Sequence, residues 1–248
     1  NTIKHHLSFF KPAFRFAFEK MYINVNLFSR IKAPKVALQK PDFFSIAETE
    51  TIWEALEHEC LAIPIKLSVW TGLRRSELLG LKWSVVDLKN SIIKIEEKVL
   101  NINGKGLRFY KDLKTESSYR SIPLSPEAVE LFLQQKQLAE ANKKNSLYNN
   151  KYSDYVFVDK FGEFIHPDRL TRTVKRICEK NNIEGHFHKL RHTYATQLRK
   201  GGAKLEVIQE LLGHSTFSTT VNYYLGVDID DKKEAIDKLS QRLTFKKN

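Results

Sequence analysis

Apolar residues recur three or four positions apart along most of the chain, and polar residues occupy the positions between them. This spacing predicts amphipathic helices, each with one face for the core and one for solvent. Proline, serine or glycine stands at several of the predicted ends, where those residues favour helix termination or capping. The predicted helices cover residues 7–30, 49–59, 64–71, 125–141, 166–180, 188–200, 205–212 and 229–243.

Between residues 91 and 124 the pattern changes to short alternating runs. Residues 91–99, 106–112 and 119–124 are rich in β-branched and aromatic side chains and are separated by turn residues. They predict a small antiparallel sheet with Lys114 in or near a hairpin turn. The chain is therefore expected to be an α+β protein that is mainly helical, with a small antiparallel β-sheet on one side.

A proline- and lysine-containing stretch, residues 34–42, interrupts the helical pattern near the start and reads as an extended linker. The aromatic helix before it has Phe14, Phe18 and Met21 at helical spacing, and Pro12 is expected in its first turn. A domain boundary is predicted here, with residues 1–33 on one side and residues 43–248 on the other.

The net charge of the chain indicates which class of partner it binds. Forty-one Lys and Arg residues against 29 Asp and Glu residues leave a net charge of +12 (41 − 29), which favours a polyanion such as nucleic acid. Its two cysteines, Cys60 and Cys178, lie too far apart in sequence for a disulfide framework or a CxxC zinc site, which suits a reducing cytoplasm. No secretory signal or membrane-spanning run is expected, because the apolar runs are too short.

Cationic side chains at two predicted helices point to phosphate chemistry. Arg74 and Arg75 stand at the entry of a short helix, where backbone N–H groups and two guanidinium groups would face the same way. His188 and Arg191 share a face of a later helix. Clustered carboxylates for a two-metal site are missing near these residues, so guanidinium groups would replace the metal around a phosphorus atom.

The same part of the chain supplies candidates for proton transfer and nucleophilic attack. His214 follows the Gly213 that ends a predicted helix, and two tyrosines, Tyr223 and Tyr224, come about ten residues later. A tyrosine becomes a useful nucleophile when nearby cations ease its loss of a proton. Lysine or histidine can then protonate the leaving alkoxide.

Further basic residues gather on the predicted sheet and on the helix at 166–180. On that helix three arginines recur at i, i+3 and i+7, opposite an apolar stripe of Leu170, Val174 and Ile177. Such a face favours contact with a nucleic-acid backbone. The predicted DNA contacts are Arg75, Lys105, Arg108, Lys111, Arg120, Arg169, Arg172, Lys175 and Arg176.

Four motifs in order, TGLRRSELLGLKW, KTESSYRSIPL, HKLRHTYAT and LLGHSTFSTTVNYY, resemble those of the tyrosine recombinase (phage-type integrase) family. They span residues 71–224, nearly the whole catalytic domain of that family. The resemblance implies a site-specific recombinase or integrase that cleaves and rejoins DNA through a covalent 3′-phosphotyrosine, without metal, cofactor or ATP. It implies that Arg74 and Arg191 clamp the scissile phosphate and that Glu77 supports them.

The resemblance also distributes the remaining roles. Lys114 would protonate the 5′-oxygen, His188 would assist proton transfer, and His214 would donate a hydrogen bond to the phosphate. Family members carry the nucleophile nine or ten residues after the histidine of the LGH step, and this chain has Tyr223 and Tyr224 at those places. Tyr224 is preferred because the Leu-Gly-Val that follows it matches the usual spacing to a valine.

The resemblance also implies which molecules the protein binds. Residues 1–33 resemble the last helix of a truncated core-binding domain, and the helix at 229–243 would pack on a neighbouring protomer in a tetrameric synapse on double-stranded DNA. The protein is expected in the bacterial cytoplasm, associated with the nucleoid when bound. Both an integrase of a mobile genetic element and a chromosome-dimer resolvase fit the motifs.

Three alternatives remain at this point. His186, His188 and His192 form an HxHxxxH pattern that zinc could use, although no acid or cysteine completes it. A catalytically silent DNA-binding regulator could share the fold. A type IB topoisomerase shares the mechanism, but the short chain and integrase-like spacing argue against it.

Overall fold

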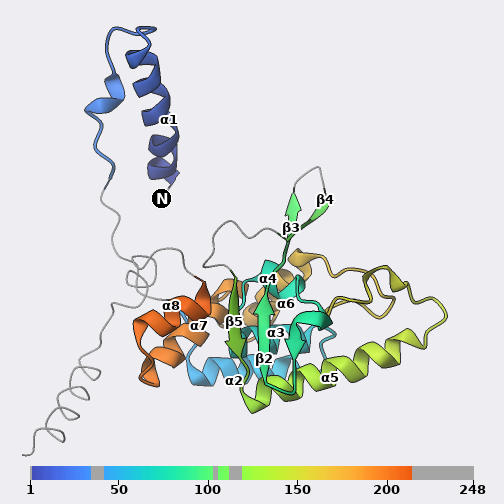
Figure 1. Ribbon diagram of the computed structural model, residues 1–248. Helices are drawn as coiled ribbons and strands as arrows, with labels where there is room; N and C mark the ends of the chain where they lie inside the picture. Colours follow the sequence, from blue (N-terminus) through green and yellow to red (C-terminus); the bar gives the residue numbers. More distant parts are fainter. Residues whose placement is uncertain (1, 35–41, 103–105, 112–118, 214–248) are drawn as a thin grey trace, which may run out of the picture. The chain divides into compact units, whose positions relative to one another are not determined.

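The protein, seen as a computed structural model, divides into two compact units, Asn1–Gln39 and Lys40–Asn248 (Figure 1). The structure describes residues 2–34, 42–102, 106–111 and 119–213. The division falls within the predicted linker, residues 34–42. The assignment of residues 1–33 to a core-binding domain stays a prediction.

The first unit is one helix, α1 (Thr2–Glu19), followed by a 3-10 turn, η1 (Leu27–Ser29). The turn folds back so that the Phe28 ring lies 4.4 Å from that of Phe14, measured between ring centroids. Two expectations are wrong here. Pro12 lies inside α1 rather than in its first turn, because the helix begins at Thr2, and Met21 lies beyond the helix with φ of 57°.

Helices are the main secondary structure in the described residues of the second unit. Its helices are α2 (Ile46–Ala55), α3 (Ala62–Thr71), α4 (Arg75–Leu79), α5 (Pro126–Lys143), α6 (Pro167–Lys180), α7 (Phe187–Lys200) and α8 (Leu205–Leu212), with 3-10 turns η2 (Trp83–Val85) and η4 (Asn150–Tyr152). Several ends are set by local chemistry. The Ser45 hydroxyl accepts from the Glu48 N–H, and the Glu48 carboxylate accepts from the Ser45 N–H, which caps α2 as the sequence predicts. Ser125 caps α5 through the Ala128 N–H.

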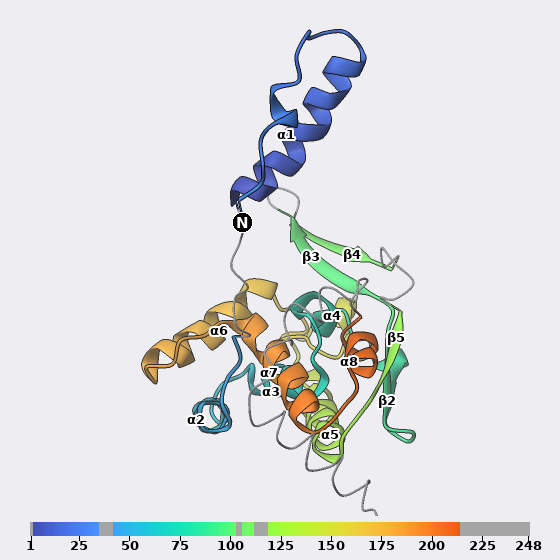
Figure 2. The same cartoon turned by 90° about the vertical axis from the view of Figure 1, so that its left-hand side faces the viewer.

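The strands form two sheets rather than the single sheet expected. Strands β1 (Val86–Asp87), β2 (Ile92–Ile95) and β5 (Arg120–Pro123) make an antiparallel sheet in the order β1-β2-β5, with Ile93 opposite Ile122. Strands β3 (Lys98–Ile102) and β4 (Gly106–Tyr110) form a separate antiparallel ribbon. In both views this ribbon projects from the helices (Figures 1 and 2).

Glu97 explains the break between the two sheets. It stands between β2 and β3, where its buried carboxylate accepts from the Tyr155 hydroxyl at 2.9 Å and pairs with Lys82 at 2.9 Å. A side chain at Gly80, the residue after α4, would place its Cβ 2.7 Å from the Glu97 carbonyl oxygen. The chain is therefore held against the end of α4 at this point, and β3 leaves the line of β2.

One apolar core joins the three-stranded sheet to the helices. The predicted stripe of α6 is confirmed, since Leu170, Val174 and Ile177 are all buried. The sheet, α3, α5 and α7 contribute Ile93, Ile122, Leu67, Phe132 and Leu190 to the same cluster. None of the helices in the described stretches has the length and hydropathy needed to cross a bilayer.

Candidate functional site

The site forms where α4, α7, the end of α8 and strand β5 meet. It begins at Gly72, which ends α3 with a left-handed φ of 63°. A Cβ at this position would lie 2.2 Å from Cδ1 of Tyr194 on α7, so only glycine lets the two elements approach so closely. The Gly72 carbonyl accepts a hydrogen bond from Nη1 of Arg191 at 2.6 Å.

Glu77 on α4 is the acid that these elements share. Its side chain is 5% exposed, and it accepts from Nη1 of Arg74 at 2.7 Å and from the Arg74 backbone N–H at 3.0 Å. The guanidinium of Arg120 on β5 donates to both Glu77 oxygens, at 2.9 and 3.4 Å. Nη1 of Arg191 lies 3.9 Å from Oε2 of Glu77, beyond hydrogen-bonding distance.

These cations keep Glu77 ionised. Burial alone would raise the pKa of the Glu77 carboxyl, but Arg120, Arg191 and Arg74 outweigh it and lower that pKa to about 2. Three guanidinium groups around one carboxylate leave two positive charges in excess. An anion such as a phosphate is the complementary ligand for that excess.

The last turn of α8 supplies backbone carbonyl groups that accept hydrogen bonds from the same arginines. Arg120 donates to the Leu211 carbonyl at 2.7 Å, Arg74 and Arg191 donate to the Leu212 carbonyl, and Arg74 also donates to the Gly213 carbonyl at 3.2 Å. Helix C-termini leave carbonyls without intrahelical partners and carry partial negative charge. The three arginines therefore donate hydrogen bonds to carbonyl groups at the end of α8 that lack intrahelical partners. These bonds also help to hold the three arginines together.

The side chains of the three arginines differ in how much of their surface is exposed to solvent. The side chains of Arg120 and Arg191 are each 3% exposed, whereas that of Arg74 is 36% exposed. Arg74 is therefore the guanidinium of this group that presents most surface to solvent.

His188 lies one helical turn before Arg191 on α7, as the sequence predicts. Burial disfavours its charged form, and repulsion from His192 and Arg191 adds to this, so the pKa of His188 is lowered to about 4. Its ring meets that of His192 edge-on with 4.8 Å between centroids. At neutral pH His188 is therefore an uncharged imidazole, able to accept a proton on one nitrogen and donate from the other.

The structure brings together Arg74, Glu77, His188 and Arg191, four of the predicted site residues. The others predicted for catalysis, Lys114, His214, Tyr223 and Tyr224, lie outside the described residues, as does the predicted DNA contact Lys105. Their roles stay predictions.

Two predictions for neighbouring arginines are wrong. The guanidinium groups of Arg74 and Arg75 do not face the same way, because Arg75 turns to α6 and donates to Asp168 at 3.0 Å and to Thr171 at 2.6 Å. Arg120, expected to contact DNA, is buried in the Glu77 network instead.

A signal for the buried position of Arg120 was present in the sequence. Side chains two apart on a strand share a face, and Arg120 shares its face with the fully buried Ile122. The carbonyl groups at the end of α8 had no such signal, because main-chain partners do not depend on residue type.

Of the remaining predicted DNA contacts in the described residues, all are exposed except Arg169, which is half-buried. Arg108 on β4 and Lys111 are exposed. On α6, Arg176 pairs with Glu59 at 2.6 Å and Lys175 lies 3.6 Å from Glu179. Arg172 donates to the Asp168 carbonyl, and Arg169 lies 3.8 Å from the Cys60 sulfur. DNA contact by these residues stays a prediction.

Metal binding gains no support from the arrangement of possible ligands. Within the described part of the chain, no three His, Cys, Asp or Glu side chains are grouped as a metal ion would need. His186, His188 and His192 therefore do not form the zinc site considered from their spacing.

Comparison with known proteins gives a consistent picture. The profile of the Phage integrase family matches residues 42–229. A tyrosine recombinase XerC-like protein of Caldanaerobacter subterraneus subsp. tengcongensis is 33% identical over 96% of this chain and 66% of its own length. The tyrosine recombinase XerC of Natranaerobius thermophilus is 31% identical over 90% of this chain and 71% of its own length. This chain therefore spans about two thirds of the length of such relatives.

Solved structures share the fold. The Tn1549 transposon integrase in complex with a circular intermediate DNA superposes with a TM-score of 0.80 at 22% identity, covering 96% of this chain and 79% of that one. A lambda integrase tetramer bound to a Holliday junction gives a TM-score of 0.62 at 20% identity, covering 86% of this chain and 58% of that one. The mainly helical α+β fold predicted from the sequence is confirmed.

Proposed function

Because the chain belongs to the phage integrase family of tyrosine recombinases, we propose that it cleaves and rejoins DNA at specific sites through a covalent 3′-phosphotyrosine. The observation that carries this proposal is the convergence of Arg74 and Arg191, far apart in sequence, on the buried carboxylate of Glu77. That arrangement keeps an excess of positive charge where a scissile phosphate would bind.

The proposed chemistry is an in-line exchange at phosphorus. The Tyr224 oxygen forms a bond to phosphorus as the bond to the 5′-oxygen breaks, and Lys114 supplies the proton to that leaving oxygen. Arg74 and Arg191 stabilise the charge that develops on the non-bridging oxygens. The tyrosyl ester keeps the energy of the broken bond, so a 5′-hydroxyl can reverse the step and reseal the strand.

The two histidines would complete this site. His188 is uncharged at neutral pH, so one of its ring nitrogens would be able to accept the tyrosyl proton. His214 would donate a hydrogen bond to the phosphate. Its support is the family motif LLGH, residues 211–214, which begins with the last two residues of α8.

The decisive experiment is to trap the covalent intermediate. A nicked suicide duplex loses its short leaving strand after cleavage, so a recombinase should remain attached to the 3′-phosphate and migrate as a protein–DNA band on a denaturing gel. A catalytically silent DNA-binding regulator would bind the duplex and leave no band, which would overturn the proposal. A type IB topoisomerase would relax supercoiled plasmid lacking the target site, whereas a site-specific recombinase should not.

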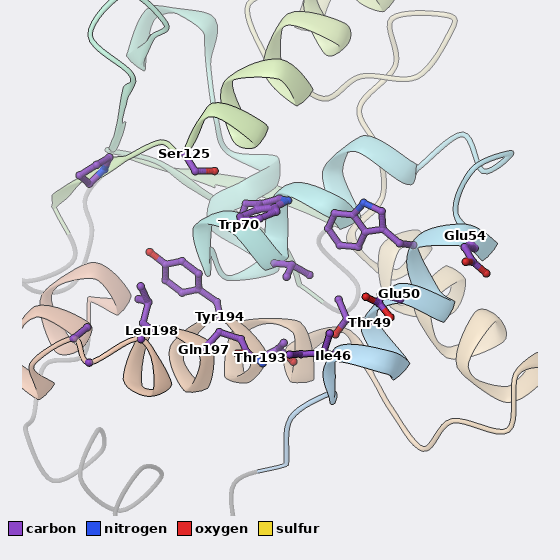
Figure 3. A pocket seen from close by; sticks show the side chains of 16 residues that line it. Ile46, Thr49, Glu50, Glu54, Trp70, Ser125, Thr193, Tyr194, Gln197 and Leu198 are labelled. Carbon is purple, nitrogen blue, oxygen red and sulfur yellow. The ribbon is translucent and has the colours of Figure 1, made fainter. Parts of the chain in front are cut away.

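We also propose that the protein assembles on DNA through residues 229–243, which lie outside the described residues and are predicted from sequence to form a helix that docks on a second copy. The supporting feature is a groove of about 1030 Å³ between α2, α3 and α7 (Figure 3). Trp53, Trp70, Tyr194 and Leu198 give it an apolar wall. The tetramer seen for lambda integrase on a Holliday junction belongs to that protein and motivates the comparison.

The sequence of residues 229–243 complements this groove. Ile236, Leu239 and Leu243 form an apolar stripe at helical spacing. Four basic residues, Lys232, Lys233, Lys238 and Arg242, lie among them together with four acidic ones, and the groove carries Glu50 and Glu54 on α2. Apolar contact favours docking, and pairing of the basic side chains with these two acids would fix its register.

Two single variants should each prevent assembly, Trp70→Glu in the groove and Leu239→Glu on the helix. Docking between copies predicts that a mixture of the two regains one working contact and forms dimers on DNA by analytical ultracentrifugation. Docking within one chain predicts that the mixture stays as deficient as each variant alone, and that result would contradict the proposal. Glu140→Lys, on the exposed part of α5, should leave assembly unchanged.

The location of the protein follows only by inference. A recombinase that acts on bacterial DNA would work in the cytoplasm, associated with the nucleoid when bound. This location stays a prediction. Detection of the protein in nucleoid fractions would test it.

A further inference from the structure

Arg120 is a basic residue held inside the site rather than on its surface. Its side chain is 3% exposed, although it lies on β5 at one end of the three-stranded sheet. Its Nη2 donates to Oε2 of Glu77 at 2.9 Å, its Nη1 lies 3.4 Å from Oε1, and its Nε donates to the Leu211 carbonyl at 2.7 Å. The planar guanidinium of Arg120 thus links the sheet by hydrogen bonds to α4 and to the end of α8.

The neighbouring arginines depend on the same two partners. Arg74 bonds to Glu77 and to the carbonyls of Leu212 and Gly213, and Arg191 bonds to the Leu212 carbonyl. Arg120 bonds to the same acid and to the preceding carbonyl of the helix end, that of Leu211. Any movement of Glu77 or of the last turn of α8 is therefore passed to the two arginines proposed to clamp the phosphate.

We propose that Arg120 is a positioning residue for DNA cleavage, which fixes Glu77 and the end of α8 so that Arg74 and Arg191 keep their geometry. This inference rests on the proposed recombinase function of the same site. It assigns to Arg120 no contact with DNA.

The distances show how the site would change without Arg120. Oε2 of Glu77 now accepts from the Arg74 N–H and from Arg120, and Arg191 remains 3.9 Å away. When Arg120 no longer holds Oε2, the carboxylate can turn toward Nη1 of Arg191, which lies 3.9 Å from that oxygen. Arg191 would then be drawn away from the carbonyls of Gly72 and Leu212. A clamp displaced by about 1 Å lowers the rate by about a hundredfold.

Arg120→Lys tests this role because it keeps the charge and removes the planar fork. The variant should lower the single-turnover rate of adduct formation by about 10- to 100-fold at saturating protein. Its DNA affinity and the slope of that affinity against salt should match the wild type. Arg199→Lys, an identical exchange at an exposed position on α7, is the matched control and should change neither quantity.

Each other outcome overturns the inference. A loss of affinity with a shallower salt slope would make Arg120 a phosphate contact, since each lost phosphate contact removes about 0.9 from that slope. An unchanged cleavage rate in Arg120→Lys, with the wild type active, would remove the positioning role alone. An inactive wild type would overturn the proposed function together with this inference.

A double-mutant cycle separates positioning from a general loss of stability. If Arg120 acts through Glu77, the effects of Arg120→Lys and Glu77→Gln on the cleavage rate should be strongly non-additive. Additive effects would overturn the inference. Thermal unfolding and DNA affinity report whether each variant is folded, and Arg120→Gln, which retains a planar donor, replaces Arg120→Lys if the lysine variant does not fold.

Discussion

Replacing Tyr224 with phenylalanine is expected to abolish the covalent protein–DNA adduct while leaving DNA affinity unchanged. The substitution keeps the ring and removes only the oxygen that would attack phosphorus. Loss of a nucleophile lowers the rate far more than loss of a neighbouring group, so a decrease of at least about a thousandfold is expected. The measurement is the yield of the denaturation-resistant band on a nicked suicide duplex, with affinity measured in parallel by gel shift.

Tyr223→Phe is the matched control, since it makes the same change one residue earlier. It should keep most of the adduct, because the spacing of Tyr224 to the following Leu-Gly-Val fits the nucleophile position. The opposite pattern, adduct lost in Tyr223→Phe and kept in Tyr224→Phe, would move the role to Tyr223. An adduct that persists in both variants would mean that neither tyrosine is the nucleophile.

Local sequence signals predicted the helices of the second unit that the structure describes, because their causes are local. Ser45 and Glu48 form their capping box within four residues of each other, and Gly72 and Gly213 end helices with left-handed φ values of 63° and 62°. The apolar stripe of α6 faces the core as its spacing indicates. Each of these features depends on neighbouring residues along one element, and tertiary packing agrees with it.

The parts that were mispredicted depend on partners far away in sequence. The sequence predicts that the guanidinium groups of Arg74 and Arg75 face the same way. In the structure Arg75 instead donates hydrogen bonds to Asp168 and Thr171 of α6. Nothing near residue 97 indicates that Tyr155 and Lys82 will hold Glu97 and separate β3 from β2. Residue types nominated the cations of the site, and strand alternation with Ile122 indicated burial of Arg120, but the burial of Arg191 depends on carbonyl groups that residue types do not indicate.

The structure changes the interpretation of the cationic group as well. From sequence, Arg74 and Arg191 were assigned to the scissile phosphate and Arg120 to a contact with DNA. In the folded protein Arg74 is the most exposed, Arg191 is held by backbone carbonyls, and Arg120 supports their shared acid. The site is therefore better described as one partly exposed guanidinium, that of Arg74, on a buried network of two arginines, one acid and the end of a helix.

Arg191→Lys is expected to lower the rate of DNA cleavage by about 10²- to 10³-fold although the charge is kept. Arg191 uses separate nitrogens for the Gly72 and Leu212 carbonyls, and a single ammonium cannot reproduce a planar fork. Removing one preorganised hydrogen-bond donor that stabilises charge in the transition state lowers the rate by about 10²- to 10³-fold. Single-turnover cleavage at saturating protein measures it.

DNA affinity should stay close to the wild-type value in Arg191→Lys, because binding depends on many phosphate contacts and the net charge is unchanged. The exposed exchange Arg199→Lys, on the same helix, controls for the substitution itself. A melting temperature near that of the wild type would show that the loss of rate arises in the site, where Arg191 also approaches Glu77 to 3.9 Å. Cleavage at a near-normal rate would contradict the proposed clamp, since an ammonium would then serve as well as the guanidinium that this network of carbonyls orients.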